Sequence, residues 1–382
     1  MSAPLSALTP VQAMALALQQ AQQVLPDADP NPRVGCVVLN AQGQLLAQGH
    51  TQRVGGPHAE VMALQALRDA GHTAQGSTVY VTLEPCAHHG RTPPCCDALV
   101  QAGVARVVVA LPDPNPRVAG QGLARLRAAG IDVQVLPGDD PHARAARELN
   151  LGFLSRMVRG TPWVRMKIAA SLDGQTALSD GTSQWITSAA ARADGHAWRA
   201  RASVVLTGIG TVLEDNPRLD VRDVATLRQP GLVVVDSRLE TPLHAALFDI
   251  TRPLLIYHAV ADAPRQAALQ ARGATLVHCP GRQPGSEGKV DLADLLQDLA
   301  RREVNEVHVE AGHKLNGSLV REGLVDEFLV YLAPKLLGAG RGMVNIGPLA
   351  ALSEAVALEF MDSTRIGPDL RLRAQLAGRD RF

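Results

Sequence analysis

The sequence predicts an α/β protein with two domains: a three-layer α/β sandwich, followed by a domain built on a mixed sheet. Three observations support this. The chain has 382 residues, too many for one ordinary domain. Short apolar runs typical of strands alternate with helical segments throughout both halves. A polar turn, Arg159-Gly160-Thr161-Pro162, separates the halves. We place the boundary near Val158, giving domains 1–158 and 159–382.

For the first half of the chain, the sequence predicts strands and helices in the order β-β-α-β-α-β-α-β. A helix over 11–25 precedes them, with Thr9 as its cap and Pro10 in its first turn. Strands are expected within 31–39, 45–49, 78–83, 104–111 and 131–136. The helices between them are expected from Pro57 to Gly71, from Pro94, and over 121–129. A single helix over 141–157 closes this unit.

The second half again alternates strands with helices. Strands are expected at 163–170, 203–206, 231–235, 253–257, 274–278 and 304–310. Two further apolar strands are expected near 327–332 and 358–360. They favour a mixed rather than a purely parallel sheet.

Composition restricts the function classes and the compartment. Lys+Arg and Asp+Glu both number 37, so no net charge attracts polyanions, which argues against a nucleic-acid partner. The five cysteines are odd in number and three lie near a histidine, which indicates metal binding in a reducing compartment rather than disulfides. No run approaches the roughly 20 apolar residues of a membrane span. We therefore expect a cytoplasmic protein without membrane contact.

A candidate zinc site lies between His58 and Cys96. One imidazole and two thiolates suit Zn²⁺, and three protein ligands leave the fourth position to water. Glu60, two residues after His58, is suited to be the general acid/base that serves this water. A His-x-Glu motif followed by Pro-Cys and a second Cys is typical of zinc nucleobase deaminases. The alternative interpretation is a core histidine beside buried cysteines.

The spacing of the cysteines leaves one ligand open. Eight residues separate Cys86 from Cys95, whereas the usual motif is Cys-x-x-Cys, and Cys96 is adjacent to Cys95. Pro85-Cys86 and Pro94-Cys95 both resemble helix starts, where the helix dipole favours thiolate. The inserted loop carries His88, His89 and Arg91, which could face a phosphate or the metal, or lie in solvent.

The segment from Thr82 to Cys95, TLEPCAHHGRTPPC, resembles the bifunctional riboflavin-biosynthesis deaminase–reductase family. In that family the inserted loop is the rule, and the resemblance makes His58, Cys86 and Cys95 the ligands of one Zn²⁺ per chain. It makes Asn31 a substrate-binding residue. Where the family usually has an aromatic residue and then a histidine, this chain has His50-Thr51, so no phosphate contact is carried over there.

The resemblance continues into the second half through Lys167–Gly174 (KIAASLDG) and Ser183–Thr187 (SQWIT). It implies a cytidine-deaminase-like first domain and a dihydrofolate-reductase-like second domain that uses NADPH to reduce a ribosyl group. Lys167 also stands out without the resemblance, because a charge in the middle of an apolar strand needs a reason. We predict that Lys167 is catalytic and faces the ribose.

Two glycine-containing turns follow buried strands and enter helices, at Gly208–Thr211 and at Glu310–Ser318, where phosphate could bind backbone N–H groups. Neither matches the Rossmann fingerprint. By resemblance, NADPH contacts Ala169, Trp185, Thr211, Asp215, Ser237, Gly312, His313, Lys314, Leu315, Asn316, Gly317 and Ser318. By resemblance, substrate contacts Ser183, Arg199, Leu219, Arg222 and Glu310. Arg199 and Arg222 are suited to hold a phosphate bidentately.

The leading hypothesis is a two-step enzyme. It deaminates 2,5-diamino-6-(ribosylamino)-4(3H)-pyrimidinone 5′-phosphate and then reduces the ribosyl group with NADPH. A tRNA deaminase with an accessory domain is the alternative, but it should show a basic face and base-stacking aromatics. A non-enzymatic binding module is the third, with Cys96 or His88 closing the zinc site. By resemblance we expect a homodimer or homotetramer.

Overall fold

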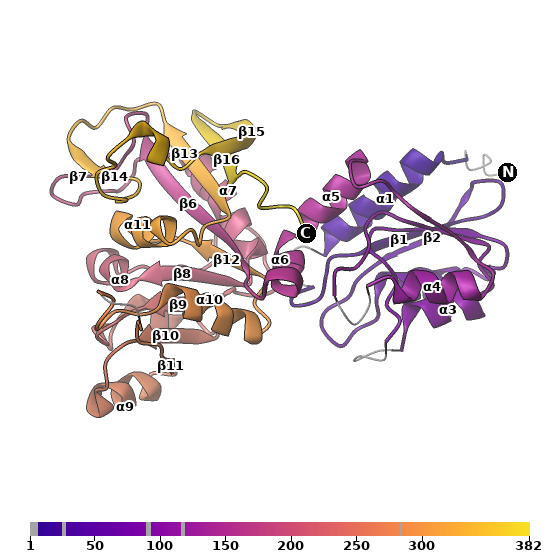
Figure 1. The fold of residues 1–382 in the computed structure, drawn as a ribbon, viewed down its shortest axis with the longest axis horizontal. Coiled ribbons are helices and arrows are strands. Elements are labelled where there is room, and N and C mark those ends of the chain that lie inside the picture. The colour runs from indigo at the N-terminus through magenta and orange to yellow at the C-terminus, as the bar shows by residue number, and fades with distance from the viewer. Residues whose placement is uncertain (1–6, 25–27, 89–92, 116–118, 283–284) are drawn as a thin grey trace. The chain divides into compact units, whose positions relative to one another are not determined.

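We describe the fold from a computed structural model that covers residues 7–24, 28–88, 93–115, 119–282 and 285–382. The chain divides into two compact units (Figure 1). The first runs to Arg159 and includes Phe382, whose ring lies 4.7 Å from the Arg159 guanidinium carbon; the second is Gly160–Arg381. Within the described ranges, no helix combines the length and the apolar character needed to cross a bilayer.

The first unit is a five-stranded sheet with helices around it. Its strands are ordered β2-β1-β3-β4-β5; β1 runs antiparallel to β2 and β3, and β3, β4 and β5 run parallel. The strands are β1 Gly35–Leu39, β2 Leu45–His50, β3 Thr78–Val81, β4 Arg106–Val109 and β5 Asp132–Val135. The helices are α1 Pro10–Gln23, α2 Ala59–Asp69, α3 Cys95–Gln101, α4 Gln121–Ala128, α5 Pro141–Leu149 and α6 Leu151–Arg159.

Two glycines explain how closely the helices approach this sheet. A Cβ atom at Gly35 would lie 1.9 Å from the carbonyl oxygen of Ala17 in α1, and one at Gly49 would lie 2.5 Å from the backbone nitrogen of Ala63 in α2. Gly49 pairs with Cys36, the neighbour of Gly35, and neighbouring strand residues point to opposite faces. Helices α1 and α2 therefore cover opposite faces, which produces the predicted three layers.

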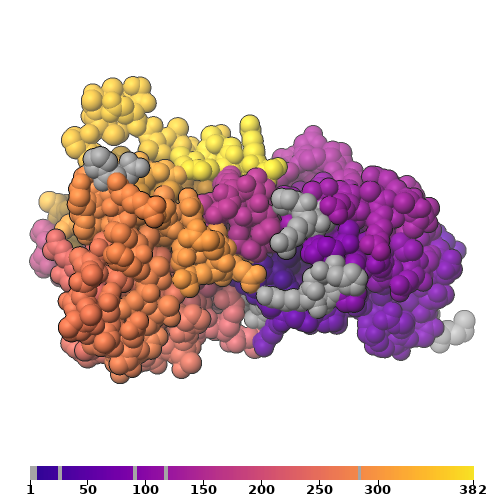
Figure 2. Space-filling model, turned by 60° about the horizontal axis from the view of Figure 1, so that its bottom comes forward, coloured from indigo at the N-terminus to yellow at the C-terminus, as the bar shows by residue number. Residues whose placement is uncertain are grey.

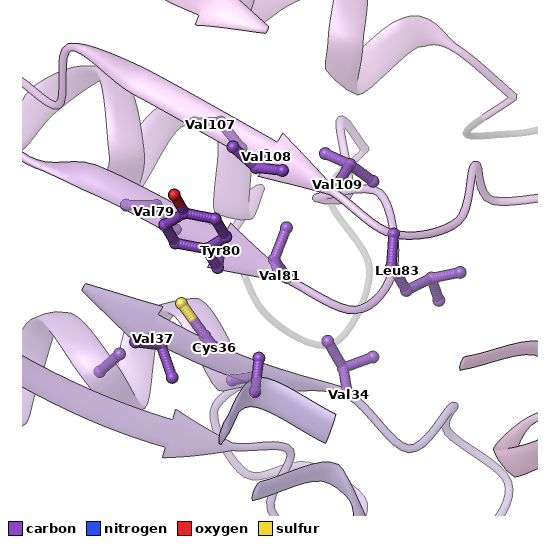
Figure 3. Packing of buried hydrophobic residues seen from close by; sticks show 14 of the residues in the cluster. Val34, Cys36, Val37, Val79, Tyr80, Val81, Leu83, Val107, Val108 and Val109 are labelled. Atoms are coloured by element: carbon purple, nitrogen blue, oxygen red, sulfur yellow. The ribbon is translucent and has the colours of Figure 1, made fainter. Parts of the chain in front are cut away.

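The core of the first unit lies on the central strands (Figure 3). Val37, Val79, Val81, Val107 and Val109 are fully buried, and they come from β1, β3 and β4. Runs of β-branched residues buried on both faces are typical of central strands covered by helices. This packing fixes the ends of β2 and β3, from which the residues of the candidate metal site follow.

The prediction of one helix over 141–157 is wrong, because Asn150 separates α5 from α6. The amide of Asn150 binds the main chain of Arg33: Oδ1 accepts from Arg33 N at 2.7 Å, and Nδ2 donates to Arg33 O at 3.0 Å. Nδ2 also donates to Ala146 O at 3.1 Å. A partner 117 residues away in sequence thus interrupts the helix.

The second unit contains a nine-stranded sheet in the order β11-β10-β9-β8-β12-β6-β13-β16-β15. The strands from β11 to β13 run parallel, whereas β13, β16 and β15 pair antiparallel, so the predicted mixed sheet is confirmed. The strands are β6 Trp163–Ser171, β8 Val204–Gly208, β9 Gly231–Val235, β10 Leu254–His258, β11 Thr275–His278, β12 Glu306–Val309, β13 Glu327–Ala333, β15 Leu358–Ile366 and β16 Asp369–Leu376.

The remaining elements of this unit are helices and one small ribbon. The helices are α7 Ala189–Arg201, α8 Ile209–Asp215, α9 Ala263–Ala271, α10 Leu292–Arg301 and α11 His313–Arg321, with 3₁₀ turns η1 Ala246–Asp249 and η2 Leu352–Glu354. Strands β7 Gln175–Leu178 and β14 Gly340–Gly342 form the two-stranded ribbon. The sequence reading omitted β7, β14 and β16 and made β15 too short, since these strands are mostly polar, glycine-containing or exposed.

The two faces of the nine-stranded sheet differ in character. Met166 and Ile168 of β6 and Val307 of β12 pack into the apolar core with leucines of α10 and α11. The alternating residues Arg165 and Lys167 point to the opposite face. Helix α7 lies over this second face, because its Ala191 packs with Leu329 and Tyr331 of β13.

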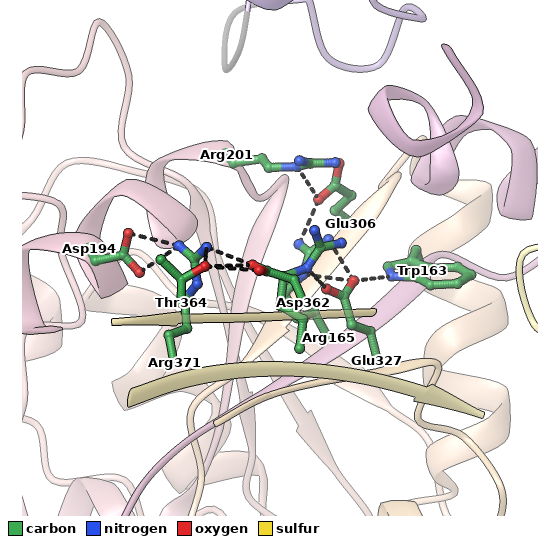
Figure 4. A network of polar contacts seen from close by, with 10 residues as sticks. Trp163, Arg165, Asp194, Arg201, Glu306, Glu327, Asp362, Thr364 and Arg371 are labelled. Carbon is green, nitrogen blue, oxygen red and sulfur yellow. Dashed lines mark hydrogen bonds and ion pairs between the residues drawn. The ribbon is translucent and has the colours of Figure 1, made fainter. Parts of the chain in front are cut away.

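A buried ionic network anchors α7 to that face (Figure 4). Arg165, which is fully buried, lies 2.9 Å from Glu306 and 2.9 Å from Glu327. Helix α7 contributes Arg201, which pairs with Glu306 at 3.1 Å, and Trp198, whose ring centroid lies 4.6 Å from the Arg165 guanidinium carbon. Buried charges of this kind require such pairing. The network therefore fixes the helix that borders the second candidate site.

Candidate functional sites

The first site assembles three ligand-type side chains from separate elements. His58 is the N-cap residue of α2, Cys86 follows β3, and Cys95 opens α3. His58 Nδ1 lies 3.6 Å from Cys86 Sγ and 3.3 Å from Cys95 Sγ, and the three donor atoms lie within 4.8 Å of one another. The donor set of one nitrogen and two sulfurs fits Zn²⁺. The adjacent Cys96 does not belong to this group of donors.

Glu60 lies beside the cluster in the first turn of α2. Glu60 is 3% exposed, and its carboxyl group lies beside the Cys95 thiol. Burial raises the pKa of Glu60 to about 7, with a further contribution from the negative charge of Cys86. A carboxyl group with a pKa near neutrality is suited both to take up and to release a proton.

Cys86 has the character of a thiolate. Hydrogen bonds from Cys95 and His58 lower the pKa of Cys86 to about 4 against the opposing effect of burial. The backbone N–H of Cys95 also donates to Cys86 Sγ at 3.3 Å. The expected helix at Pro85-Cys86 is wrong, since residues 82–88 contain no helix; only Pro94-Cys95 begins one. These hydrogen bonds therefore replace the helix dipole at Cys86.

The other residues considered for this site have different positions. Asn31 is partly exposed in the turn before β1, two residues from Arg33, the partner of Asn150. Thr51 is buried and binds the main chain of Val34, with its Oγ1 accepting from Val34 N at 3.2 Å; it is therefore a structural residue. His50 contacts Gln20 of α1 at 3.3 Å. His89 and Arg91 lie outside the described residues.

Glu84 was quoted in the motif but received no role from the sequence. It is 3% exposed, and its carboxylate accepts four backbone N–H groups, from Asp113, Gly120, Gly122 and Leu123, at 3.0–3.3 Å. Glu84 thus ties the segment after β4 and the start of α4 to the loop that carries Cys86. The sequence signal for this role was a glutamate directly after an apolar strand, because a buried carboxylate needs hydrogen-bond partners.

The second site is a cavity of about 400 Å³ within the second unit. Most residues assigned there by resemblance line it: Lys167, Ala169, Ser183, Trp185, Arg199, Thr211, Asp215, Leu219, Arg222, Glu310, Gly312, His313 and Asn316. They come from the polar face of β6, the residue after β12, helix α8, the start of α11 and the loops before α7 and after α8, with α7 as one wall. Such convergence of polar groups on one cavity is typical of a ligand site.

A charged cluster lies at the floor of this cavity. Glu310 accepts two hydrogen bonds from Arg199, at 2.6 and 3.0 Å, and lies 3.7 Å from Lys167 Nζ. Burial would raise the pKa of Glu310, but the charges of Arg199 and Lys167 outweigh it and hold the pKa well below its usual range. The two guanidinium nitrogens of Arg199 that could bind a phosphate bidentately already bind Glu310. The predicted bidentate contact between Arg199 and a phosphate therefore does not agree with the structure.

The cavity also fits a nicotinamide dinucleotide. Asn316 of α11 is 3% exposed, and its Oδ1 has no hydrogen-bond partner among the residues that the structure describes. Gly312 is the N-cap residue of α11 and lines the same cavity, so unsatisfied backbone N–H groups begin there. An unpaired buried acceptor beside a helix start suits a ligand with amide and phosphate groups.

Five of the residues assigned to NADPH lie outside the cavity lining: Ser237, Lys314, Leu315, Gly317 and Ser318. Ser237 Oγ accepts from Val290 N at 3.1 Å. Leu315 packs into the apolar core, and a Cβ at Gly317 would lie 1.9 Å from Asn345 O. The side chains of consecutive residues in a helix cannot all face one ligand, because successive side chains point about 100° apart.

The sequence reading missed three residues that hold the chain between α8 and β9. Arg252 donates to Leu219 O at 2.6 Å and to Arg218 O. The amide of Gln229 binds both the N–H and the carbonyl of Val221, at 2.7 and 2.8 Å. His196 of α7 accepts from Arg222 N at 3.3 Å. We call residues 218–223 the clamped segment, since side chains bind its main chain at successive residues.

Comparison with known proteins gives matches over both units. Residues 9–111 match the cytidine and deoxycytidylate deaminase zinc-binding region, and residues 162–372 match the RibD C-terminal domain. The riboflavin biosynthesis protein RibD of Escherichia coli is 44% identical over 94% of this chain and 97% of its own length.

Two solved structures are similar over nearly the whole chain. RibD of Acinetobacter baumannii has a TM-score of 0.84 at 39% identity, covering 95% of this chain and 97% of that one. A diaminohydroxyphosphoribosylaminopyrimidine deaminase/5-amino-6-(5-phosphoribosylamino)uracil reductase from Thermotoga maritima has a TM-score of 0.82 at 29% identity, covering 96% and 98%.

Proposed function

We propose the residues and the substrate of each reaction on the premise that this chain belongs to the RibD family of bifunctional riboflavin biosynthesis enzymes. These enzymes join a zinc-dependent deaminase to an NADPH-dependent reductase. The substrate of the first is 2,5-diamino-6-(ribosylamino)-4(3H)-pyrimidinone 5′-phosphate. The second reduces the ribosyl group of its deaminated product to give 5-amino-6-(ribitylamino)uracil 5′-phosphate. We assign the reactions to domains 1–158 and 159–382.

In the deaminase, His58, Cys86 and Cys95 hold Zn²⁺, which supplies a Lewis acid that activates water at neutral pH. Glu60 moves a proton from the attacking water to the amino nitrogen, which leaves as ammonia. The single observation that supports this best is the position of the buried Glu60 in the first turn of α2, two residues after His58 and beside the three grouped donor atoms. Asn31 is proposed to bind the pyrimidine.

In the reductase, NADPH supplies the hydride, and the chain holds the two reactants in contact. Lys167 and Glu310 line one cavity and lie 3.7 Å apart, which suits them to the ribosyl carbon that accepts the hydride. Glu310 and Ser183 are proposed to bind ribosyl hydroxyls. Arg222 is half-exposed at the cavity and is proposed to pair with the 5′-phosphate.

The family, the fold class and the two cofactors predicted from the sequence are confirmed. A tRNA deaminase with an accessory domain is not favoured, because the C-terminal match is to the RibD reductase domain. The substrate is accordingly a small molecule. That the enzyme binds no nucleic acid and is located in the cytoplasm stay predictions.

We propose that the enzyme forms a homo-oligomer. Every residue from 347 to 361 is exposed, and six of them are large and apolar: Leu349, Leu352, Val356, Leu358, Phe360 and Met361. Figure 2 shows golden-coloured chain from this part of the sequence standing out from the second unit. Exposed apolar side chains on and before an edge strand, β15, support contact with a second copy.

The test is a mass spectrum of the products formed from the diaminopyrimidinone ribosyl phosphate, with and without NADPH. We expect a deaminated product without NADPH, and a product both deaminated and reduced with it. Deamination alone would contradict the reductase assignment. No reaction by protein with zinc bound would contradict the substrate assignment for both sites.

A further inference from the structure

We propose that His196 is a positioning residue of the reductase: it holds Arg222 where this arginine can pair with the 5′-phosphate of the substrate. The inference rests on the proposed function, which gives Arg222 that role. His196 lies on α7, 4% exposed, and borders the cavity beside Arg199. Both ring nitrogens of His196 contact protein groups, and neither needs a water molecule as a partner.

The contacts of His196 define its tautomer. Nδ1 accepts the backbone N–H of Arg222 at 3.3 Å, so Nδ1 carries no proton. The proton is therefore on Nε2, which lies 3.3 Å from a carboxylate oxygen of Asp223. Burial lowers the pKa of His196, which keeps the ring neutral and Nδ1 an acceptor. One imidazole thus binds two consecutive residues of the clamped segment.

The geometry of α7 explains why this residue acts on the substrate site. Arg192, Gly195, His196 and Arg199 follow the spacing of one helix face, and all four line the cavity. Asp194, Trp198 and Arg201 lie on the face that joins the buried ionic network; Tyr331 OH, for example, donates to Asp194 at 2.5 Å. A helix fixed on one face therefore presents His196 at a defined position on the other.

The clamped segment needs such support at its end. Leu219 has φ +51, a left-handed conformation that is unfavourable for a residue with a side chain. Arg252, Arg199 and Gln229 bind the main chain at 218–221. At Arg222, the main chain is bound by His196. Arg222 Nη1 also donates to Asp220 Oδ1 at 2.6 Å, which limits the directions open to its guanidinium group.

The experiment compares reductase kinetics with the deaminated substrate and with its analogue that lacks the 5′-phosphate. In His196→Leu, we expect KM for the phosphorylated substrate to rise about tenfold, near the loss of one hydrogen bond, with kcat nearly unchanged. KM for the analogue should match that of the parent enzyme. Intrinsic fluorescence of the three tryptophans, all of which belong to the second unit, is the control for folding.

Two matched variants separate the contacts of the ring. His196→Asn places an amide oxygen near the position of Nδ1 and should restore most of the affinity. His196→Gln extends past that position and should not. Equal affinity losses for both substrates, or no benefit of Asn over Gln, would overturn the inference and make His196 a general structural residue.

A double-mutant cycle distinguishes this inference from the proposed function beneath it. Arg222→Gln should raise KM for the phosphorylated substrate only, and adding His196→Leu should cost little more, because the two residues act through one contact. If Arg222→Gln leaves KM unchanged, the proposed role of Arg222 is wrong. If Arg222→Gln raises KM but the two losses add, the role of Arg222 stands and that of His196 is wrong.

Discussion

Arg199 and Glu310 form a bidentate pair, in which Nε and Nη2 of the arginine meet the two carboxylate oxygens at 2.6 and 3.0 Å. Lysine keeps the charge but cannot reproduce this fork. We expect Arg199→Lys to lower reductase kcat/KM about 100-fold, since a disrupted buried pair costs about 3 kcal/mol. Steady-state kinetics with NADPH measures this. The exposed Arg301→Lys is the control, and equal rates for both would contradict the role of the pair.

Glu60→Gln should inactivate the deaminase alone. The amide fills the same space but carries no transferable proton, so we expect the deamination rate to fall by about 10²- to 10⁴-fold. Release of ammonia measures the rate, and zinc content and reductase rate should not change. Unimpaired deamination would show that Glu60 is not the group that transfers the proton.

The two adjacent cysteines should respond differently to substitution. Cys95→Ser removes a thiolate from the group formed with His58 and Cys86, so bound zinc and deaminase activity should both be lost. Cys96→Ser should retain both, because Cys96 lies outside that group. Elemental analysis of the purified variants decides between them. A chelator should likewise abolish deamination and leave the reductase active.

Glu327 should stabilise the second unit in a pH-dependent way. Burial would raise its pKa, but Arg165 and Arg373 outweigh burial and lower it from 4.5 to about 2. A lowered folded-state pKa stabilises above the unfolded value, and this stabilisation, about 3 kcal/mol, is lost as pH falls from about 4.5 through about 2. Glu327→Gln should therefore lower stability more at pH 7 than at pH 2.5.

Intrinsic fluorescence can follow this unfolding selectively. The three tryptophans, Trp163, Trp185 and Trp198, all belong to the second unit. Urea denaturation monitored at both pH values measures the change, and the exposed Glu359→Gln on β15 serves as the control. An equal loss of stability at both pH values would show that the charge of Glu327 is not responsible.

Asn150→Leu should weaken the first unit only. Leucine leaves the buried N–H of Arg33 without its acceptor, which costs about 1–3 kcal/mol. We expect heat inactivation of the deaminase at a lower temperature, with the reductase unaffected. Asn150→Asp should not restore stability, because it keeps the acceptor for Arg33 N but turns an oxygen toward the carbonyl oxygens of Arg33 and Ala146. If leucine, a stronger helix former, instead stabilised the deaminase, the contact with Arg33 would be of little value.

Features that depend on neighbouring residues in the sequence were predicted correctly, whereas features that depend on contacts between distant residues were not. The central strands are continuous apolar runs, and His58 and Cys86 lie in short motifs, so local pattern was sufficient for these. Cys95 was preferred to Cys96 only through the family resemblance. Asn150 interrupts a helix through a partner 117 residues away, which no local pattern contains. The two thiols at positions 95 and 96 are equivalent in spacing; the start of α3 directs only Cys95 toward His58.

In the second unit, resemblance identified residues that line a cavity, but it could not identify what supports them. His196 and Arg222 are 26 residues apart, and Arg252 reaches Leu219 across 33. A histidine in a helix and an arginine in a loop carry no signal of such contacts. For the same reason Arg199 was read as a phosphate ligand, although its partner, Glu310, lies 111 residues away.

The clamped segment has a thermodynamic consequence for catalysis. A loop without regular structure ordinarily loses conformational entropy when it closes on a ligand, and that loss weakens binding. Here side chains from α7, from the chain before β9 and from the chain before β10 have already ordered residues 218–222 during folding. In the proposed complex the substrate therefore meets a preorganised surface, and its binding free energy remains available for aligning the ribosyl carbon with the hydride donor.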